Sequence, residues 1–95
     1  QLTAVVDLSN RCIRLLDKCI QRPTPERMAK LERVETAFKA ATKPIVPLTL
    51  ATQHDLTVIT SQAPAVTDLK SSLKLCRALY AAIGQRAREI LSKEQ

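Results

Sequence analysis

Glycine and aromatic side chains are scarce in this chain of 95 residues, which has one glycine, one phenylalanine, one tyrosine and no tryptophan. Tight β-turns commonly need glycine and strands are enriched in aromatic residues, whereas the abundant Leu, Ala, Lys and Arg favour helices. The composition therefore predicts an all-α fold, and the length predicts a single domain, residues 1–95. Because the sequence opens at Gln1 without a methionine, we expect this domain to come from a longer or processed protein.

Long apolar runs are also missing, because Arg, Lys, Asp or Pro interrupts every hydrophobic stretch before it approaches the roughly 20 residues that a membrane span requires. No membrane span is expected. The sequence contains no glycine-rich phosphate loop, no nucleophile beside a base and no pair of carboxylates on one inward face. We therefore expect no enzymatic activity and no cofactor.

The three cysteines, Cys12, Cys19 and Cys76, fall on apolar rows and not in loops. They are interpreted as small core residues of an intracellular protein, cytoplasmic or nuclear, where thiols stay reduced. Cys12 and Cys19 are two helical turns, about 10 Å, apart, which is too far for a disulfide. A bridge from Cys76 to either is geometrically open, and no zinc-ligand spacing is present.

Four segments separated by proline predict an up-and-down bundle of three or four helices, of which the last is the longest. The expected helices are about Leu2–Gln21, about Pro25–Thr42, Ile45–Ala63, and from near Ala65, or after a cap at Thr67, to about Lys93. Thr24 is a good N-cap and Pro25 suits the first helical position. The short connection between the first two helices requires them to lie antiparallel.

The third segment is the weakest prediction because Thr, Val and Ile give it β character. Asp55 falls inside its apolar face, where an unpaired carboxylate would be costly. Either Asp55 pairs with a basic side chain such as Arg27, or the segment is not one regular helix. His54, the single histidine, is interpreted as an ordinary residue at the edge of a face, because Asp55 beside it would repel a phosphate group.

The last segment carries an apolar row at heptad spacing: Val66, Leu69, Leu73, Cys76, Tyr80, Ile83, Ala87 and Ile90. At about 42 Å, against about 24–30 Å for the others, this helix is expected to extend beyond its neighbours. The overhang would leave Ala87, Ile90 and Leu91 uncovered unless the helix bends, for which Gly84 offers a place. A second row, Leu75, Leu79 and Ala82, faces either a second neighbouring helix or an external partner.

Fifteen Lys and Arg against nine Asp and Glu give a net charge of +6. The basic residues form one stripe on the first helix and one on the last: Arg11, Arg14, Lys18 and Arg22, and Lys70, Lys74, Arg77 and Arg88. Side by side, the two stripes would make an electropositive patch, although solvated helix faces are often rich in such residues.

The leading functional hypothesis is a non-enzymatic protein-interaction domain of adaptor or scaffold type. It would bind an amphipathic or acidic segment, or self-associate, through Leu75, Leu79, Ala87, Ile90 and Leu91. The alternative is a basic module that binds nucleic acid or an anionic surface through the two stripes, although the two aromatic residues belong to core rows and offer no stacking platform.

Overall fold

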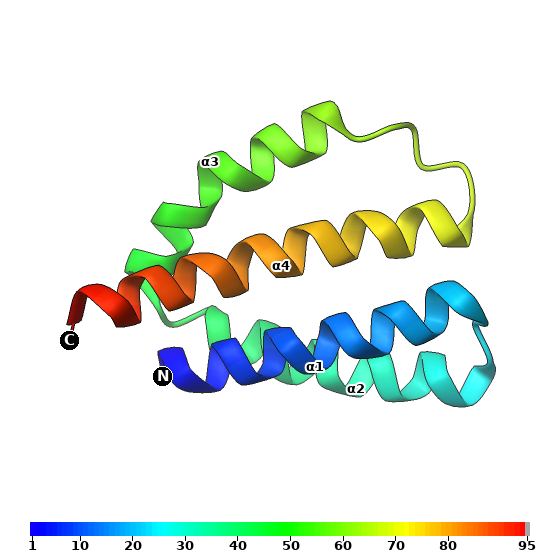
Figure 1. Cartoon of the computed structure of the whole chain (residues 1–95), viewed down its shortest axis with the longest axis horizontal. Coiled ribbons are helices and arrows are strands. Elements are labelled where there is room, and N and C mark those ends of the chain that lie inside the picture. The colour runs from blue at the N-terminus through cyan, green and yellow to red at the C-terminus, as the bar shows by residue number, and fades with distance from the viewer. Residues whose placement is uncertain (95) are drawn as a thin grey trace.

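The computed structural model describes residues 1–94. It contains the helices α1 (Leu2–Gln21), α2 (Pro25–Thr42), α3 (Val46–Gln62) and α4 (Leu69–Glu94). Successive helices run in opposite directions (Figure 1). The predicted all-α, up-and-down bundle with a long last helix is confirmed, and the predicted bounds of the first two helices match those of α1 and α2. Within residues 1–94, every helix is too short or too polar to cross a membrane.

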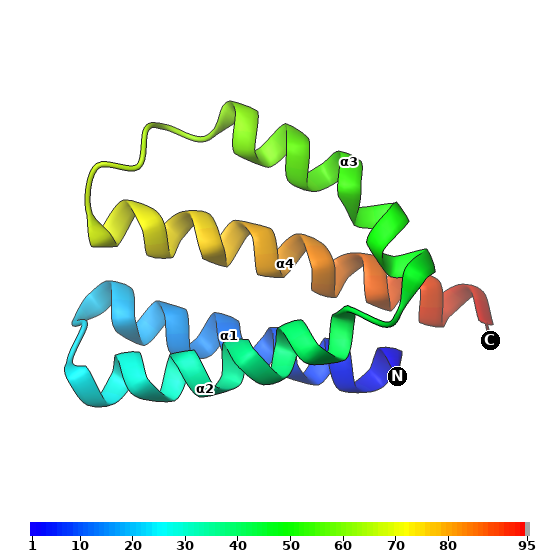
Figure 2. The ribbon, with the colours of Figure 1, turned by 180° about the vertical axis from the view of Figure 1, so that it is seen from behind.

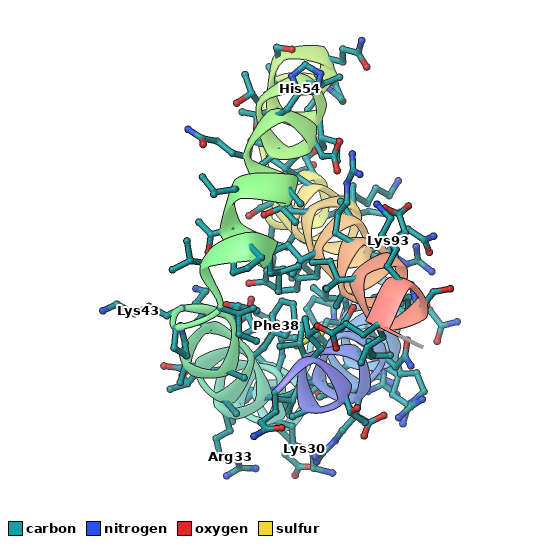
Figure 3. All side chains as sticks on the ribbon, turned by 90° about the vertical axis from the view of Figure 1, so that its left-hand side faces the viewer. Lys30, Arg33, Phe38, Lys43, His54 and Lys93 are labelled. Atoms are coloured by element: carbon teal, nitrogen blue, oxygen red, sulfur yellow. The ribbon has the colours of Figure 1, made fainter. Side chains whose placement is uncertain are left out.

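Three of the helices, α1, α2 and α4, form the main core. Its buried apolar side chains are Val5, Cys12, Leu16 and Cys19 from α1, Leu31 and Phe38 from α2, and Leu73, Tyr80 and Ala87 from α4. α1 packs against both α2 and α4, whereas α3 packs against α4 and contributes Leu48. Figure 2 shows α1 and α2 side by side from behind. Figure 3, a view along the helices, shows α3 at one end and α1 and α2 at the other.

The turn between α1 and α2 is closed by polar contacts from both sides. Thr24 caps α2, because its hydroxyl accepts a hydrogen bond from the backbone N–H of Arg27 at 3.2 Å. The Arg27 guanidinium in turn donates to the carbonyl oxygens of Lys18 (2.9 Å) and Arg22 (3.2 Å) at the end of α1. Arg27 is therefore used to satisfy the last carbonyls of α1, and the suggested pairing with Asp55 is wrong.

The register between α1 and α4 is set by close contacts of small and polar side chains. The Ser9 hydroxyl donates to the carbonyl oxygen of Tyr80 at 3.0 Å, and a Cβ atom added at Gly84 would lie 2.3 Å from the Ser9 Oγ. Further along, the Arg77 Nε donates to Asp17 Oδ1 at 2.6 Å. These contacts fix an antiparallel pairing in which Gly84 is a contact point between helices, where the sequence had suggested a bend.

The last helix does extend past its neighbours (Figure 1), but the prediction that this leaves its apolar residues uncovered is wrong. Ala87 is 0% exposed, Ile90 packs against the core and Leu91 is half-buried. The Ser9–Gly84 register places the first turns of α1 beside the end of α4, so that this end has a partner in the same chain. α4 is about 39 Å long at 1.5 Å per residue, which matches the longest dimension of the molecule, 40 Å. Its C-terminal end extends past the beginnings of α1 and α3 (Figure 1), but the residues of this last turn, 92–94, are polar and exposed.

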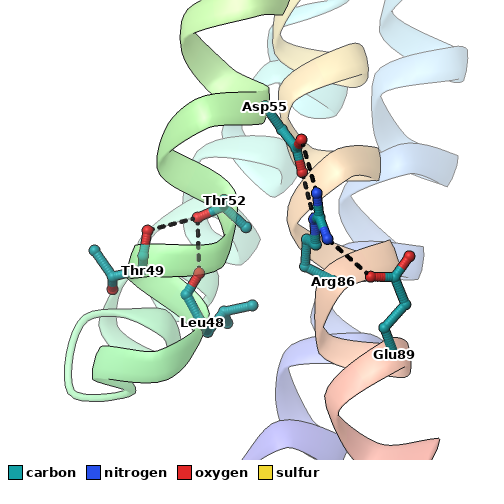
Figure 4. A network of polar contacts seen from close by, with 6 residues as sticks. All are labelled: Leu48, Thr49, Thr52, Asp55, Arg86 and Glu89. Atoms are coloured by element: carbon teal, nitrogen blue, oxygen red, sulfur yellow. Dashed lines mark hydrogen bonds and ion pairs between the residues drawn. The ribbon is translucent and has the colours of Figure 1, made fainter.

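The third segment is one regular helix, so the suggested irregularity is also wrong. Asp55 lies on its inner side and accepts two hydrogen bonds from the Arg86 guanidinium, at 2.5 and 3.0 Å, while Arg86 also donates to Glu89 at 3.1 Å (Figure 4). The partner of Asp55 thus comes from α4. The buried Thr52 hydroxyl donates to the Leu48 carbonyl one turn earlier, which leaves it satisfied within α3.

α4 begins later than predicted. The Asp68 side chain accepts a hydrogen bond from the backbone N–H of Ser71 at 2.7 Å, so Asp68 takes the capping position that the sequence had assigned to Thr67. Val66 consequently lies in the connection before α4 and is half-exposed, outside the helical row to which it was assigned. The remaining row from Leu73 to Ile90 does face the core.

Replacing Asp55 with asparagine is expected to loosen α3 from α4, because asparagine cannot form the charged, two-bond pair with Arg86. Amide hydrogen exchange in α3 should become faster, while exchange in the centre of α1 stays unchanged. Exposed Asp7, which forms no ion pair within residues 1–94, provides the matched Asp7→Asn control. Equal α3 exchange in the parent protein and in the Asp55→Asn variant would contradict the anchoring role.

The same pair predicts a pH dependence. The hydrogen bonds and charge of Arg86 lower the pKa of Asp55, so the unfolded chain takes up this proton more readily than the folded one. The Asp55–Arg86 pair therefore stabilises the fold fully above the ordinary carboxyl pKa. This stabilisation is lost as the pH falls through the lowered pKa of Asp55 in the folded protein. The difference in Tm between the parent protein and Asp55→Asn should shrink below about pH 4.

Candidate functional site: a basic groove between α1 and α2

A concave surface lined by several basic residues lies between α1 and α2. This α1–α2 groove has a volume of about 480 Å³. Its walls carry five basic residues, Arg11, Arg14, Lys18, Lys30 and Arg33. Its floor is apolar and consists of Leu8, Leu15, Val34 and Ala37. A strip of apolar surface is thus bordered by positive charge on both sides.

Helical spacing explains why these residues meet. Arg11, Arg14 and Lys18 follow one another at three and four residues on α1, and Lys30 and Arg33 are three residues apart on α2. The turn closed by Thr24 and Arg27 holds the two helices antiparallel, so both stripes border the same groove. In Figure 3, Lys30 and Arg33 point away from the body of the molecule, on the side opposite α3.

No acidic side chain lines the α1–α2 groove. The ion pairs among residues 1–94 join Arg77 to Asp17 and Arg86 to Asp55 and Glu89, so none of them involves a basic residue of the groove. Glu26 lines an adjoining hollow with Lys18 and Lys30, while Arg11, Arg14 and Arg33 have no acid among the lining residues. Positive charges on facing helices repel one another and attract an anionic ligand. The electrostatics of this groove therefore favour a negatively charged occupant.

Two residues of the basic stripe predicted on α4 are engaged by polar side chains of α1. Arg77 is paired with Asp17, and the Arg88 guanidinium donates to the Asn10 side chain at 2.7 Å, so both are engaged at the contact with α1. Lys70 and Lys74 are exposed on α4, and Lys74 lies at the border with α3. Of the predicted residues on α1, Arg11, Arg14 and Lys18 line the groove, while Arg22 lies exposed at the end of the helix.

The predicted apolar contact residues are placed differently as well. Leu79 packs against the core, and Leu75 borders a second groove of about 500 Å³ between α3 and α4, beside Ile59, Ala63 and Ala78. The second row of α4 therefore faces a neighbouring helix of the same chain. Ala87 and Ile90, as described above, are covered within the fold.

The interior holds titratable groups whose environment suppresses their reactivity. Burial raises the pKa of the Cys12 thiol to about 11, and it also raises the pKa of the thiols of Cys19 and Cys76. Burial and the hydrogen bond to Glu35 raise the pKa of Tyr80 far above its usual range. These groups remain protonated at neutral pH and supply no nucleophile. Within residues 1–94, no cluster of three His, Cys, Asp or Glu side chains could hold a metal ion.

The sequence analysis missed the contribution of α2 to the basic surface. Lys30 and Arg33 were not among the basic residues singled out from the sequence, although the antiparallel arrangement of the first two helices was predicted. The short turn between α1 and α2 could have indicated this contribution, because it requires one side of α2 to lie beside one side of α1. Which flank meets the basic stripe depends on the rotation of α2 about its axis, and this is set by the burial of Leu31 and Phe38.

Comparison of the chain with protein-family models, with curated proteins and with solved structures gave no match.

Proposed function

We propose that this chain is a non-enzymatic protein-interaction domain that binds an acidic, amphipathic segment of a partner protein in the α1–α2 groove. The observation that supports this function is the combination of five unpaired basic side chains with an apolar floor in one concave surface. An amphipathic helix with leucine-like residues on one face and acidic residues on its flanks matches both properties. The floor would contribute affinity, and the basic walls would select the charge of the partner and speed its association.

The composition of the groove favours a protein segment over nucleic acid. Single strands are bound mainly by stacking their bases on exposed aromatic rings, together with backbone charge. Phe38 is buried, and Tyr80 packs against it edge-to-face with ring centroids 5.2 Å apart. Neither ring borders the groove, whose floor is aliphatic. A partner with aliphatic side chains fills such a floor better than a phosphate backbone does.

The proposal is tested with a helical peptide of about 20 residues that carries leucine at heptad spacing and glutamate on both flanks. Charge reversal at the walls, in the variant Arg14→Glu, Lys18→Glu, Lys30→Glu, is expected to weaken peptide binding at least about 100-fold. This corresponds to about 1 kcal/mol for each reversed charge. The matched control reverses two exposed charges of α4, Lys70→Glu and Lys74→Glu, and should change the affinity less than about threefold. Titration calorimetry gives both values.

Salt separates the two classes of ligand. Binding of the acidic peptide should weaken by about tenfold or less between 50 and 200 mM salt, because contact with the apolar floor is insensitive to ionic strength. A nucleic acid making 6–10 phosphate contacts would lose about 10³–10⁵ in affinity over this range. Absence of peptide binding at millimolar concentration, or tighter binding of a DNA duplex with the steep salt dependence, would refute the proposal.

A further inference from the structure

α3 is held to the rest of the fold by few contacts. It packs mainly against α4, whereas α1 packs against both α2 and α4. Leu48 is the one apolar side chain that α3 adds to the core, and none of the partly buried apolar side chains packed against that core comes from residues 46–62. Within residues 1–94, the side-chain hydrogen bonds between α3 and another helix are those of Asp55 with Arg86.

The sequence of α3 also gives this helix little stability of its own. Val, Ile and Thr, which are weak helix formers, make up seven of its 17 residues. Its N-cap residue, Ile45, makes no side-chain capping bond, whereas Thr24 and Asp68 cap α2 and α4. Segments with few buried apolar contacts open more often than the rest of a fold. α3 therefore has the properties of a helix that opens while α1, α2 and α4 stay packed.

α4 carries a row of side chains beneath α3. This α4 row consists of Leu75, Leu79, Ala82 and Arg86, whose spacing of four, three and four residues puts them on one side of the helix. Arg86 contacts Asp55 of α3, and Leu75 lines the groove of about 500 Å³ between the two helices. Figure 1 shows α3 diverging from α4 towards its carboxyl end, where this groove lies. α3 thus covers the α4 row incompletely.

We propose that α3 is a displaceable cover over a second helix-binding surface, the α4 row, and that this surface binds an amphipathic helix with one carboxylate opposite Arg86. The contacts of α3 define the partner: an apolar side chain in the position of Leu48 and, seven residues later, a carboxylate that accepts two hydrogen bonds from Arg86. A partner with longer apolar side chains after the carboxylate would also fill the groove that α3 leaves open. It would therefore gain contacts that α3 does not make.

This second surface goes beyond the proposed peptide binding and does not depend on it. The groove beside the α4 row and the α1–α2 groove have no lining residue in common. His54 on α3 and Lys30 and Arg33 of the α1–α2 groove lie at opposite ends of the molecule in Figure 3. Displacement of α3 would leave the α1–α2 groove unchanged.

Amide hydrogen exchange tests whether α3 opens by itself. Protection factors in α3 are expected to be at least about 100-fold lower than those in the centre of α1, because α3 can open without unfolding the core formed by α1, α2 and α4. Equal protection in α3 and α1 would overturn the proposal, because the α4 row would then be uncovered only in the unfolded chain.

Binding to the α4 row is tested by titration calorimetry with a 17-residue peptide. The peptide keeps the buried and half-buried residues of α3 and has alanine or glutamine at the other positions, which raises its helix propensity. The parent protein should bind it weakly, because α3 occupies the surface. Asp55→Asn loosens α3 and frees Arg86 for the carboxylate of the peptide, so this variant should bind at least about fivefold more tightly. Asp7→Asn is the matched control and should stay within about twofold of the parent protein.

Two further titrations of the Asp55→Asn variant locate the bound peptide. A peptide with asparagine in place of its aspartate should lose the fivefold gain, because Arg86 then meets no carboxylate. Charge reversal of Arg14, Lys18 and Lys30 to Glu should change the affinity less than about threefold, and a larger loss would place the peptide in the α1–α2 groove and overturn the proposal.

The proposal is also overturned if Asp55→Asn does not bind the peptide at about 1 mM or binds it no more tightly than the parent protein does. A gain that persists with the asparagine peptide would overturn it too, since the peptide would not lie on Arg86. Amide exchange in the centre of α1 confirms that each variant keeps its folded core. None of these outcomes bears on whether the acidic peptide binds in the α1–α2 groove of the parent protein.

Discussion

Replacing Phe38 with alanine is expected to lower the free energy of unfolding by about 3–5 kcal/mol, the range found when a buried phenylalanine is truncated. Phe38 is 1% exposed, and its ring meets Tyr80 edge-to-face at an interplanar angle of 67°. It is the largest fully buried side chain of the fold and the only phenylalanine. Its loss leaves a cavity at the junction of α2 and α4, where the hydrogen bond from Tyr80 to Glu35 also joins the two helices.

Domains of this size are stable by only about 5–15 kcal/mol, so the Phe38→Ala variant would lose a large part of its stability. Urea denaturation, monitored by circular dichroism, gives the difference in free energy of unfolding between the variant and the parent protein. Phe38→Leu, which retains most of the volume, should cost less than half as much as alanine. Val66→Ala, at a half-exposed position outside the helices, should cost less than about 0.5 kcal/mol. A loss below 1 kcal/mol for Phe38→Ala would show that this ring does not hold α2 against α4.

The bounds of α1 and α2 could be predicted from the sequence because local chemistry determines them. Thr24 and Pro25 end one helix and begin the next, and the residue before Pro44 closes the second. These signals act within a few residues and do not depend on the rest of the fold. The start of α4 was less clear, because Thr67 and Asp68 are both able to cap and only the hydrogen bond to Ser71 shows which one does.

Register between distant helices could not be predicted in this way. The expected exposure of Ala87, Ile90 and Leu91 came from comparing helix lengths, which ignores where along α4 the other helices attach. That position depends on Ser9 and Gly84, two small residues that carry little weight in a hydrophobic pattern. Once they are in contact, the end of α4 lies beside the beginning of α1, and Ala87 is covered.

The same limitation affected the candidate site. The sequence showed a basic stripe on α1 and another on α4, and it could not show which neighbour each stripe would meet. In the structure α4 uses Arg77 and Arg88 for contacts with α1, and the stripe of α1 is completed by α2. The Asp55–Arg86 pair was missed for this reason too, because α3 had been considered against α2 and not against α4.

At the contact between α1 and α4, helix propensity and packing are expected to have opposite effects on the stability of a Gly84→Ala variant. In an exposed helix, replacing glycine with alanine stabilises by about 1 kcal/mol. At Gly84 a new Cβ atom would lie 2.3 Å from the Ser9 Oγ and 2.9 Å from the Ser9 Cβ, which is attached to the backbone and cannot rotate away. α1 and α4 must separate, at a cost of about 1–3 kcal/mol. The Ser9–Tyr80 hydrogen bond, worth about 1 kcal/mol, would be lost as well.

Packing outweighs propensity in this comparison, so Gly84→Ala is expected to destabilise the protein by about 2 kcal/mol. Ser9→Gly removes both atoms that the new methyl group would meet. In that background Gly84→Ala should be neutral or stabilising, which gives a coupling of about 2 kcal/mol in a double-mutant cycle. Gln85→Ala, on the exposed side of α4, is the neighbouring control and should change stability by less than about 0.5 kcal/mol. A stabilised Gly84→Ala single variant would contradict the close approach of the two helices, and with it the register that covers the end of α4.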